Sequence, residues 1–232
     1  MCNQVFPRII MIIFFSAGLS ALTYAQIAVK SSNATTSTYD YTMIDQYALV
    51  VPQSAQQSIT SLAAYLSKKA TNEREKARSI FIWVGNNISY DLDNVATGKW
   101  EQRPEYVLKV RSTDCLGRSR LFEKLALAAG LEAVVIGGRV KSFEISPTHG
   151  MKYATISPNG VVYDSHSWNA IKINGNWQLI DVTAAGGKSK KQGRLEEGKP
   201  VDPYFFLTPA SEFIYTHLPD EDRVAAPRYS NI

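Results

Sequence analysis

The sequence is poor in cysteine and histidine, and this scarcity narrows the chemistry that the chain can carry. Its 232 residues include two cysteines and three histidines. It contains no Cys-x-x-Cys or His-x-x-x-His pair, and no compact cluster of histidine with carboxylates, so we expect no bound metal. It also lacks a glycine-rich phosphate-binding loop and a Gly-x-Ser-x-Gly elbow. The sequence therefore predicts no cofactor and disfavours a serine hydrolase.

A strong excess of charge is also absent. The net charge is +4 at pH 7, which is too mild to indicate a nucleic-acid partner. With 45% hydrophobic and 20% charged residues, the composition is that of an ordinary folded protein rather than a disordered or low-complexity one. The composition does not fix an oligomeric state.

The one long apolar run lies at the N-terminus. It extends from Ile9 to Leu22, follows the lone basic residue Arg8, and precedes the short residues Thr23 and Ala25. This arrangement predicts a signal peptide over residues 1–25. We therefore expect a secreted or periplasmic protein without stable membrane insertion after signal removal. A retained anchor is the alternative, although a spanning helix needs roughly 20 apolar residues and this run is shorter.

The remaining chain divides into a short lead-in and one domain. Residues 26–45 are rich in Ser, Thr and Asn and are expected to be flexible, becoming ordered near their end, whereas residues 46–232 are expected to form the domain. Apolar spacing predicts helices over 54–69, 72–86 and 115–129. Short β-rich runs follow at 133–136, 151–156, 161–164, 168–173 and 177–183. Helices followed by strands predict an α+β fold with an antiparallel sheet.

Two segments after the predicted helices have a clear local signature. Asn174-Gly175 separates two β-rich runs and suits the type I′ turn of an antiparallel hairpin. Residues 184–200 are rich in glycine and lysine and are expected to form an exposed loop.

Cys115 is the candidate nucleophile. It falls at the predicted N-terminus of the third helix, where unpaired N–H groups and the positive end of the helix dipole stabilise a thiolate. Removal of the signal peptide also removes Cys2, which leaves Cys115 without a partner for an internal disulfide. A buried, inert thiol is the alternative.

His166 and Asp181 flank the predicted hairpin. A hairpin that turns at 174–175 pairs residues whose numbers sum to about 349, so Asp181 faces Ser167 or Trp168 and lies beside His166. A carboxylate on one imidazole nitrogen would leave the other nitrogen free to hold the cysteine proton. The alternative is an exposed pair at a strand end. The hairpin geometry alone does not place Cys115 nearby.

Two blocks of sequence resemble the transglutaminase-like superfamily of papain-type cysteine enzymes, and within it the bacterial relatives of the kyphoscoliosis peptidase. TDCLGRSRLFEKLALAAGLEAVVIGG (113–138) resembles the nucleophile helix and the strand that follows it. HSWNAIKINGNWQLIDVT (166–183) resembles the His-x-Trp-Asn and Trp-x-x-x-Asp-x-Thr hairpin. Residues 76–91 and 204–219 resemble the family more weakly, so the resemblance covers roughly 76–219.

The resemblance implies a papain-like α+β fold in which the nucleophile begins a helix packed on an antiparallel sheet. It implies Cys115 as nucleophile, His166 as general base and acid, and Asp181 as the group that orients His166. Such enzymes attack a carboxamide or peptide carbonyl and pass the acyl group to water or an amine. The backbone N–H of Cys115 is implied as an oxyanion donor. A second donor would be an aromatic or amide side chain within residues 83–90.

The sequence departs from the family pattern at two positions. Asp114 stands where an apolar residue is more usual. It would oppose thiolate formation if it faced the sulfur, or stabilise the helix as an N-cap. Ala184 stands where the family has tryptophan. His149 and His217 are not expected to act in catalysis.

Taken together, these features predict an exported cysteine enzyme that acts on protein or peptide amide bonds, with hydrolysis favoured over crosslinking. The alternative is a catalytically inactive module of the same fold that binds protein or wall polymer at the cell surface.

Overall fold

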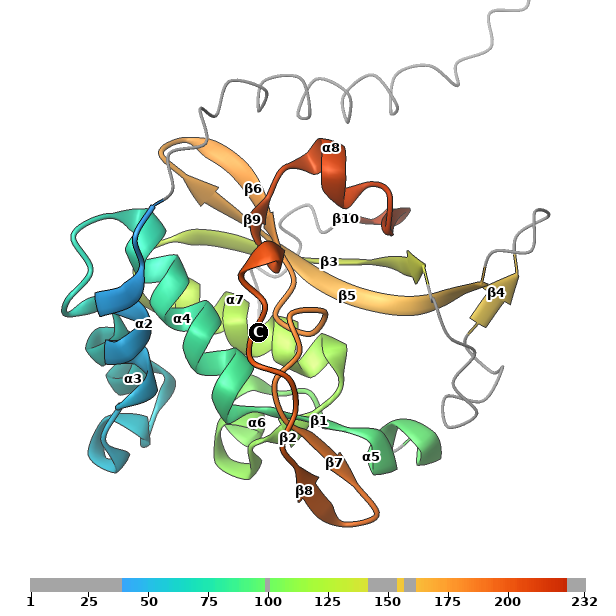
Figure 1. Cartoon of the computed structure of the whole chain (residues 1–232), viewed down its shortest axis with the longest axis horizontal. Coiled ribbons are helices and arrows are strands. Elements are labelled where there is room, and N and C mark those ends of the chain that lie inside the picture. The colour runs from blue at the N-terminus through green and yellow to red at the C-terminus, as the bar shows by residue number, and fades with distance from the viewer. Residues whose placement is uncertain (1–38, 99–100, 142–153, 157–161, 225–232) are drawn as a thin grey trace, which may run out of the picture.

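The computed structural model describes residues 39–98, 101–141, 154–156 and 162–224 (Figure 1). The predicted signal peptide, most of the lead-in and His149 lie outside these residues. Within them, no helix is both long and apolar enough to cross a membrane. Most helices precede the larger sheet along the chain, which confirms the α+β class predicted from the sequence.

The N-terminal half of the described chain is helical. Its elements are α2 (Thr42–Leu49), the 3-10 helix η1 (Gln53–Gln56), α3 (Ile59–Ser67), α4 (Glu73–Asn87), α5 (Leu92–Thr97), α6 (Pro104–Val110) and α7 (Cys115–Ala128). The helix expected over 54–69 is divided into η1 and α3, because the Ser58 hydroxyl caps α3 by accepting a hydrogen bond from the Ser61 N–H at 3.0 Å. Asn72 caps α4 in the same way.

The larger sheet is antiparallel and carries the hairpin. Its strands are β3 (Glu132–Lys141), β4 (Ala154–Ile156), β5 (Val162–Ile173), β6 (Asn176–Ile180), β9 (Phe206–Thr208) and β10 (His217–Val224). The strand order is β10-β3-β5-β6-β9, and β4 also pairs with β5. Asn174 and Gly175 both have positive φ, as a type I′ turn requires. Asn169 pairs with Ile180, which confirms the predicted register.

A second, smaller sheet was not predicted. It comprises β1 (Ser89–Asp91), β2 (Ser112–Thr113), β7 (Ser189–Lys191) and β8 (Arg194–Glu196), in the order β2-β1-β7-β8. The loop expected over 184–200 thus contains a short hairpin. It pairs in parallel with β1, about a hundred residues earlier in the chain, so no local pattern in the sequence reveals it.

The main core lies between the helices and one face of the larger sheet. Its fully buried members include Leu62, Phe81, Trp83, Phe122 and Ile171. A smaller cluster joins β3 and β5 to α8 (Ala210–Phe213), which follows η2 (Pro203–Phe205) and β9. Figure 1 shows α7 beneath the sheet and α8 above it. The start of α7 and the β5–β6 hairpin are therefore held in one packed unit.

Candidate active site

Cys115 begins α7, as the sequence predicts; its thiol forms no disulfide, and the residue is partly exposed. Asp114 is the N-cap residue. Its Oδ1 accepts a hydrogen bond from the Gly117 N–H at 2.8 Å, and its Oδ2 accepts one from the Gln102 side-chain amide at 2.6 Å. Of the two roles open to Asp114, the structure shows the cap, and both carboxylate oxygens accept hydrogen bonds.

The chain folds back tightly just before Cys115. A Cβ atom added at Gly117 would lie only 2.0 Å from the Thr113 Oγ1. The Thr113 hydroxyl also donates to the carbonyl oxygen of Glu101, at 3.3 Å. Glycine at 117 therefore lets the preceding strand pack against the first turn of α7, and this packing fixes the start of the nucleophile helix.

Asp181 is a buried carboxylate whose two oxygens have separate partners. Its Oδ1 accepts hydrogen bonds from the backbone N–H groups of Thr183 at 2.7 Å and Ala184 at 2.8 Å. Its Oδ2 lies 2.6 Å from the His166 Nε2. Burial opposes the charge on Asp181, but the neighbouring imidazoles outweigh burial and hold its pKa well below the usual range. The carboxylate is therefore ionised.

His166 connects this carboxylate to the cysteine. Burial lowers the pKa of His166, but the charge and hydrogen bond of Asp181, together with a hydrogen bond to Cys115, outweigh burial and raise that pKa to about 10. Because Nε2 faces Asp181, Nδ1 is the nitrogen available to Cys115. The structure thus pairs His166 with Asp181 by a hydrogen bond and places Cys115 close enough to His166 to raise its pKa, while the catalytic roles of the three residues remain predictions.

His217 also contacts Asp181, which sequence reasoning missed. It begins β10, pairs with Val140 of β3, and is buried. Its Nε2 lies 3.0 Å from the same Asp181 Oδ2 that binds His166. The expectation of no role rested on its position in a C-terminal segment. Long-range strand pairing places it in the site, and a single sequence gives no signal for that pairing.

The same three side chains could be considered as a metal site. One ligand atom from each of His166, Asp181 and His217 lies within 4.8 Å of the others. A zinc ion lies about 2 Å from each nitrogen and oxygen ligand, so it would have to force apart two atoms that are 2.6 Å apart. The group therefore fits a hydrogen-bonded array better than a metal centre.

Arg118 is a second residue that the sequence did not reveal. It lies one helical turn after Cys115, is almost fully buried, and donates hydrogen bonds to the carbonyl oxygens of Gly85 and Gly186 at 3.2–3.3 Å. Burial lowers the pKa of Arg118 to about 10, and the negative charge of Asp181 is the largest of the effects that oppose this fall. At neutral pH it is a buried cation close to the site.

Tyr90 is an aromatic residue of the 83–90 segment whose pKa is affected by the charge of Cys115. Burial raises the pKa of Tyr90, and negative charge at Cys115 and Asp114 raises it further, so its hydroxyl keeps its proton. The amides of Asn86 and Asn87 instead donate to carbonyl oxygens within α4. Of the residues in this segment, Tyr90 is thus the one whose pKa responds to the charge of Cys115.

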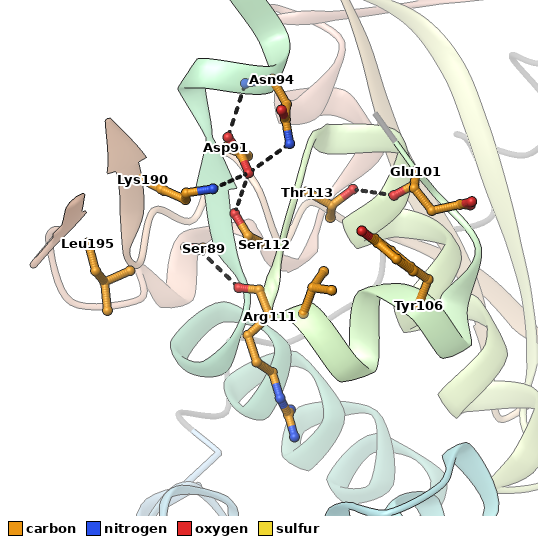
Figure 2. A pocket seen from close by; sticks show the side chains of 11 residues that line it. Ser89, Asp91, Asn94, Glu101, Tyr106, Arg111, Ser112, Thr113, Lys190 and Leu195 are labelled. Atoms are coloured by element: carbon orange, nitrogen blue, oxygen red, sulfur yellow. Dashed lines mark hydrogen bonds and ion pairs between the residues drawn. The ribbon is translucent and has the colours of Figure 1, made fainter. Parts of the chain in front are cut away.

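A cavity of about 750 Å³ adjoins the segment that leads to Cys115 (Figure 2). Asp91 lies in its wall and accepts hydrogen bonds from Asn94, Ser112 and Lys190. Burial opposes ionisation of Asp91, but these partners lower its pKa. Asp91 thus ties α5, β2 and β7 together. None of the three candidate catalytic residues lines this cavity.

Comparison with known proteins gives this geometry a family context. The kyphoscoliosis peptidase of Mus musculus is 31% identical to this chain over 70% of it and 23% of that protein. Hillarin of Drosophila melanogaster is 30% identical over 87% of this chain and 25% of that protein. The chain thus spans about a quarter of the length of these curated relatives. Among solved structures, the periplasmic domain of TgpA from Pseudomonas aeruginosa matches with 17% identity and a TM-score of 0.39, covering 63% of this chain and 48% of that chain.

The family model described as the transglutaminase-like superfamily matches residues 60–182, which is more than half of the chain. The matched range contains the first turn of α7 with Cys115 and the hairpin with His166 and Asp181. The resemblance seen in the sequence is thereby confirmed, and the chain belongs to the transglutaminase-like superfamily.

Proposed function

We propose that this protein is an exported cysteine enzyme that acts on protein or peptide amide bonds through an acyl-enzyme. The observation that carries the proposal is the pairing of His166 with the buried carboxylate of Asp181, 2.6 Å away, next to Cys115, which lies at a helix N-terminus and raises the pKa of His166. This arrangement supplies a nucleophile, a proton carrier and a group that orients the carrier.

Each residue has a distinct task in the proposed reaction. The Cys115 thiolate attacks the amide carbonyl while His166 is an imidazolium, and the oxyanion accepts hydrogen bonds from the Cys115 backbone N–H and the Tyr90 hydroxyl. His166 gives its proton to the leaving amine as the C–N bond breaks, which leaves an acyl thioester on Cys115. Neutral His166 then takes a proton from the acceptor, and the acyl group leaves on oxygen or nitrogen.

We favour water over an amine as the acceptor. Two of the matched relatives are named peptidases, which is a statement about those proteins and supports hydrolysis here only by similarity. The cysteine is partly exposed, so water can reach the acyl group.

The alternative of an inactive binding module rested on Asp114 and Ala184. Asp114 caps the nucleophile helix, and the N–H of Ala184 donates to Asp181 at 2.8 Å. The hydrogen bond from residue 184 comes from the backbone and does not depend on its side chain, so neither departure from the family pattern removes a contact of the candidate site.

The test is to offer a panel of peptides and denatured proteins together with a labelled primary amine, and to follow cleavage, deamidation and amine incorporation by mass spectrometry. Enzyme with Cys115 should form an adduct with the mass of an acyl group, and Cys115→Ala should form none. Product formation that survives Cys115→Ala would overturn the proposal, and an adduct that only amines release would replace hydrolysis with crosslinking.

A further inference from the structure

His217 and His166 share one oxygen of Asp181. The His166 Nε2 is 2.6 Å and the His217 Nε2 is 3.0 Å from Oδ2, while Oδ1 is taken by two backbone N–H groups. The exchange of a proton with Cys115 uses His166 alone. His217 is therefore a buried titratable group in the site to which the proposed reaction gives no task.

The surroundings of His217 fix which of its nitrogens carries the proton. The Thr216 hydroxyl lies 2.8 Å from Nδ1, closer than its 3.3 Å to the carbonyl oxygen of Phe213, so we assign the hydroxyl proton to Nδ1. Nε2 then carries a hydrogen and donates to Asp181. The ring stacks on Phe213 with centroids 3.8 Å apart, which holds it in this orientation.

A second donor on the same oxygen acts differently on the two protonation states of His166. When His166 is an imidazolium, it already neutralises much of the charge on Oδ2. When His166 is neutral, nothing on that side neutralises the charge of the Asp181 carboxylate, so a hydrogen bond from His217 stabilises the carboxylate more strongly. The second donor therefore favours release of the proton from His166.

We propose that His217 is a positioning residue that weakens the ion pair between Asp181 and the His166 imidazolium, because it donates a second hydrogen bond to the same carboxylate oxygen. The task follows from the burial of the site. An isolated ion pair in a buried site is strong, and an imidazolium held too strongly cannot pass its proton to a leaving group. This inference rests on the proposed function, because it concerns the proton carrier of that reaction.

The charged and titratable groups that interact with His166 and Asp181 come from two elements, β10 and α7. Besides His217 on β10, α7 contributes Cys115 and Arg118, whose charges interact with His166 and Asp181 respectively. Substitution of His217 leaves Cys115 and Arg118 in place. A change in the titration of His166 can then be assigned to the lost donor.

The experiment is an NMR titration of histidines labelled with ¹⁵N and ¹³C in the full chain, which has only three. His166→Ala identifies the His166 signal. His217→Phe removes the donor but keeps an aromatic ring against Phe213, His217→Gln restores an N–H at the place of Nε2, and Phe213→Leu reduces packing while keeping the donor. If His217→Phe does not fold, His217→Leu serves as the variant without a donor.

We expect loss of the donor to move the titration midpoint of His166 upward by about one pH unit, since a hydrogen bond to a charged group carries that much differential free energy. His217→Gln should return the midpoint close to its original value, and Phe213→Leu should leave it unchanged. An unchanged or lowered midpoint without the donor would overturn the proposal, as would the same upward shift in Phe213→Leu. Failure of the proposed function is seen separately, as the absence of an acyl adduct on Cys115 in the unsubstituted enzyme.

Discussion

Arg118 is a buried cation whose hydrogen bonds go only to carbonyl oxygens of Gly85 and Gly186 among the residues that the structure describes. A buried charge is costly unless nearby charges of opposite sign compensate it. Asp181 and Cys115 supply this compensation, because negative charge on either raises the pKa of Arg118 against the effect of burial. By reciprocity, Arg118 stabilises the carboxylate and the thiolate of the site.

Arg118→Met should reduce both stability and the reactivity of Cys115 at acid pH. Two carbonyl oxygens lose their donors, so we expect the free energy of unfolding to fall by about 3 kcal/mol, measured by urea denaturation. Arg118→Lys keeps the positive charge and should keep more of the reactivity than Met does. Equal loss of reactivity in the two variants would show that the charge of Arg118 does not act on the site.

The residues of the candidate site differ in how visible they are in the sequence. Cys115 was found from a helix start, and the contact of His166 with Asp181 followed from the register of one hairpin, so both are local features. Arg118 and His217 reach the site only through packing between elements distant in sequence. Arg118 contacts a turn 68 residues away, and His217 contacts Asp181 36 residues away. No spacing rule reports such contacts.

At the scale of elements, α7 is the element on which the nucleophile depends. Its N-cap Asp114 accepts from the Gly117 N–H and places a negative charge next to Cys115 in sequence. The cap stabilises the helix, whereas the charge opposes a thiolate. The two effects can be separated, because asparagine caps a helix without carrying charge.

Asp114→Asn keeps the cap but loses the hydrogen bond from the Gln102 amide, so it should lower the free energy of unfolding by about 1 kcal/mol and increase the rate of Cys115 alkylation at pH 5. Asp114→Ala loses the cap as well and should lower the free energy of unfolding by about 2 kcal/mol. Chemical denaturation and alkylation kinetics on the same samples give both quantities. A slower alkylation in Asp114→Asn than in the unsubstituted protein would contradict this account of the cap.

Elements with a strong local signal were predictable and elements formed by distant pairing were not. The capped helices α4 and α7 and the Asn174-Gly175 hairpin agree closely with expectation. Helix α2 and the small sheet were missed. The strands of that sheet have only two or three residues each and pair across the chain, so neither periodicity nor turn chemistry marks them. The pairing of β10 with β3 also joins segments far apart in the sequence, so local patterns could not predict it.

At the scale of the whole molecule, the buried charges of the site make stability depend on pH. His166 has a pKa raised from 6.5 to about 10, so its contribution is fully present below pH 6.5 and is lost as pH rises toward 10. Asp181 has a lowered pKa, so its contribution is present above pH 3.8 and is lost at more acid pH. Stability from this pair should therefore be greatest between these limits.

The free energy of unfolding should fall by on the order of 2 kcal/mol between pH 6.5 and pH 10, as measured by urea denaturation at fixed ionic strength. Asp181→Asn, which removes the partner charge of His166, should flatten this decline although it lowers stability overall. A decline of the same size in Asp181→Asn would assign the pH dependence to other groups.

The central claim is that Cys115 and His166 form a reactive thiolate–imidazolium pair. The most direct test is the rate of Cys115 alkylation between pH 4 and pH 9, in the unsubstituted protein and in His166→Ala. The account predicts fast alkylation at acid pH in the former and its loss in the latter. A slow rate that rises only above about pH 8, unchanged by His166→Ala, would show an inert cysteine and contradict the account.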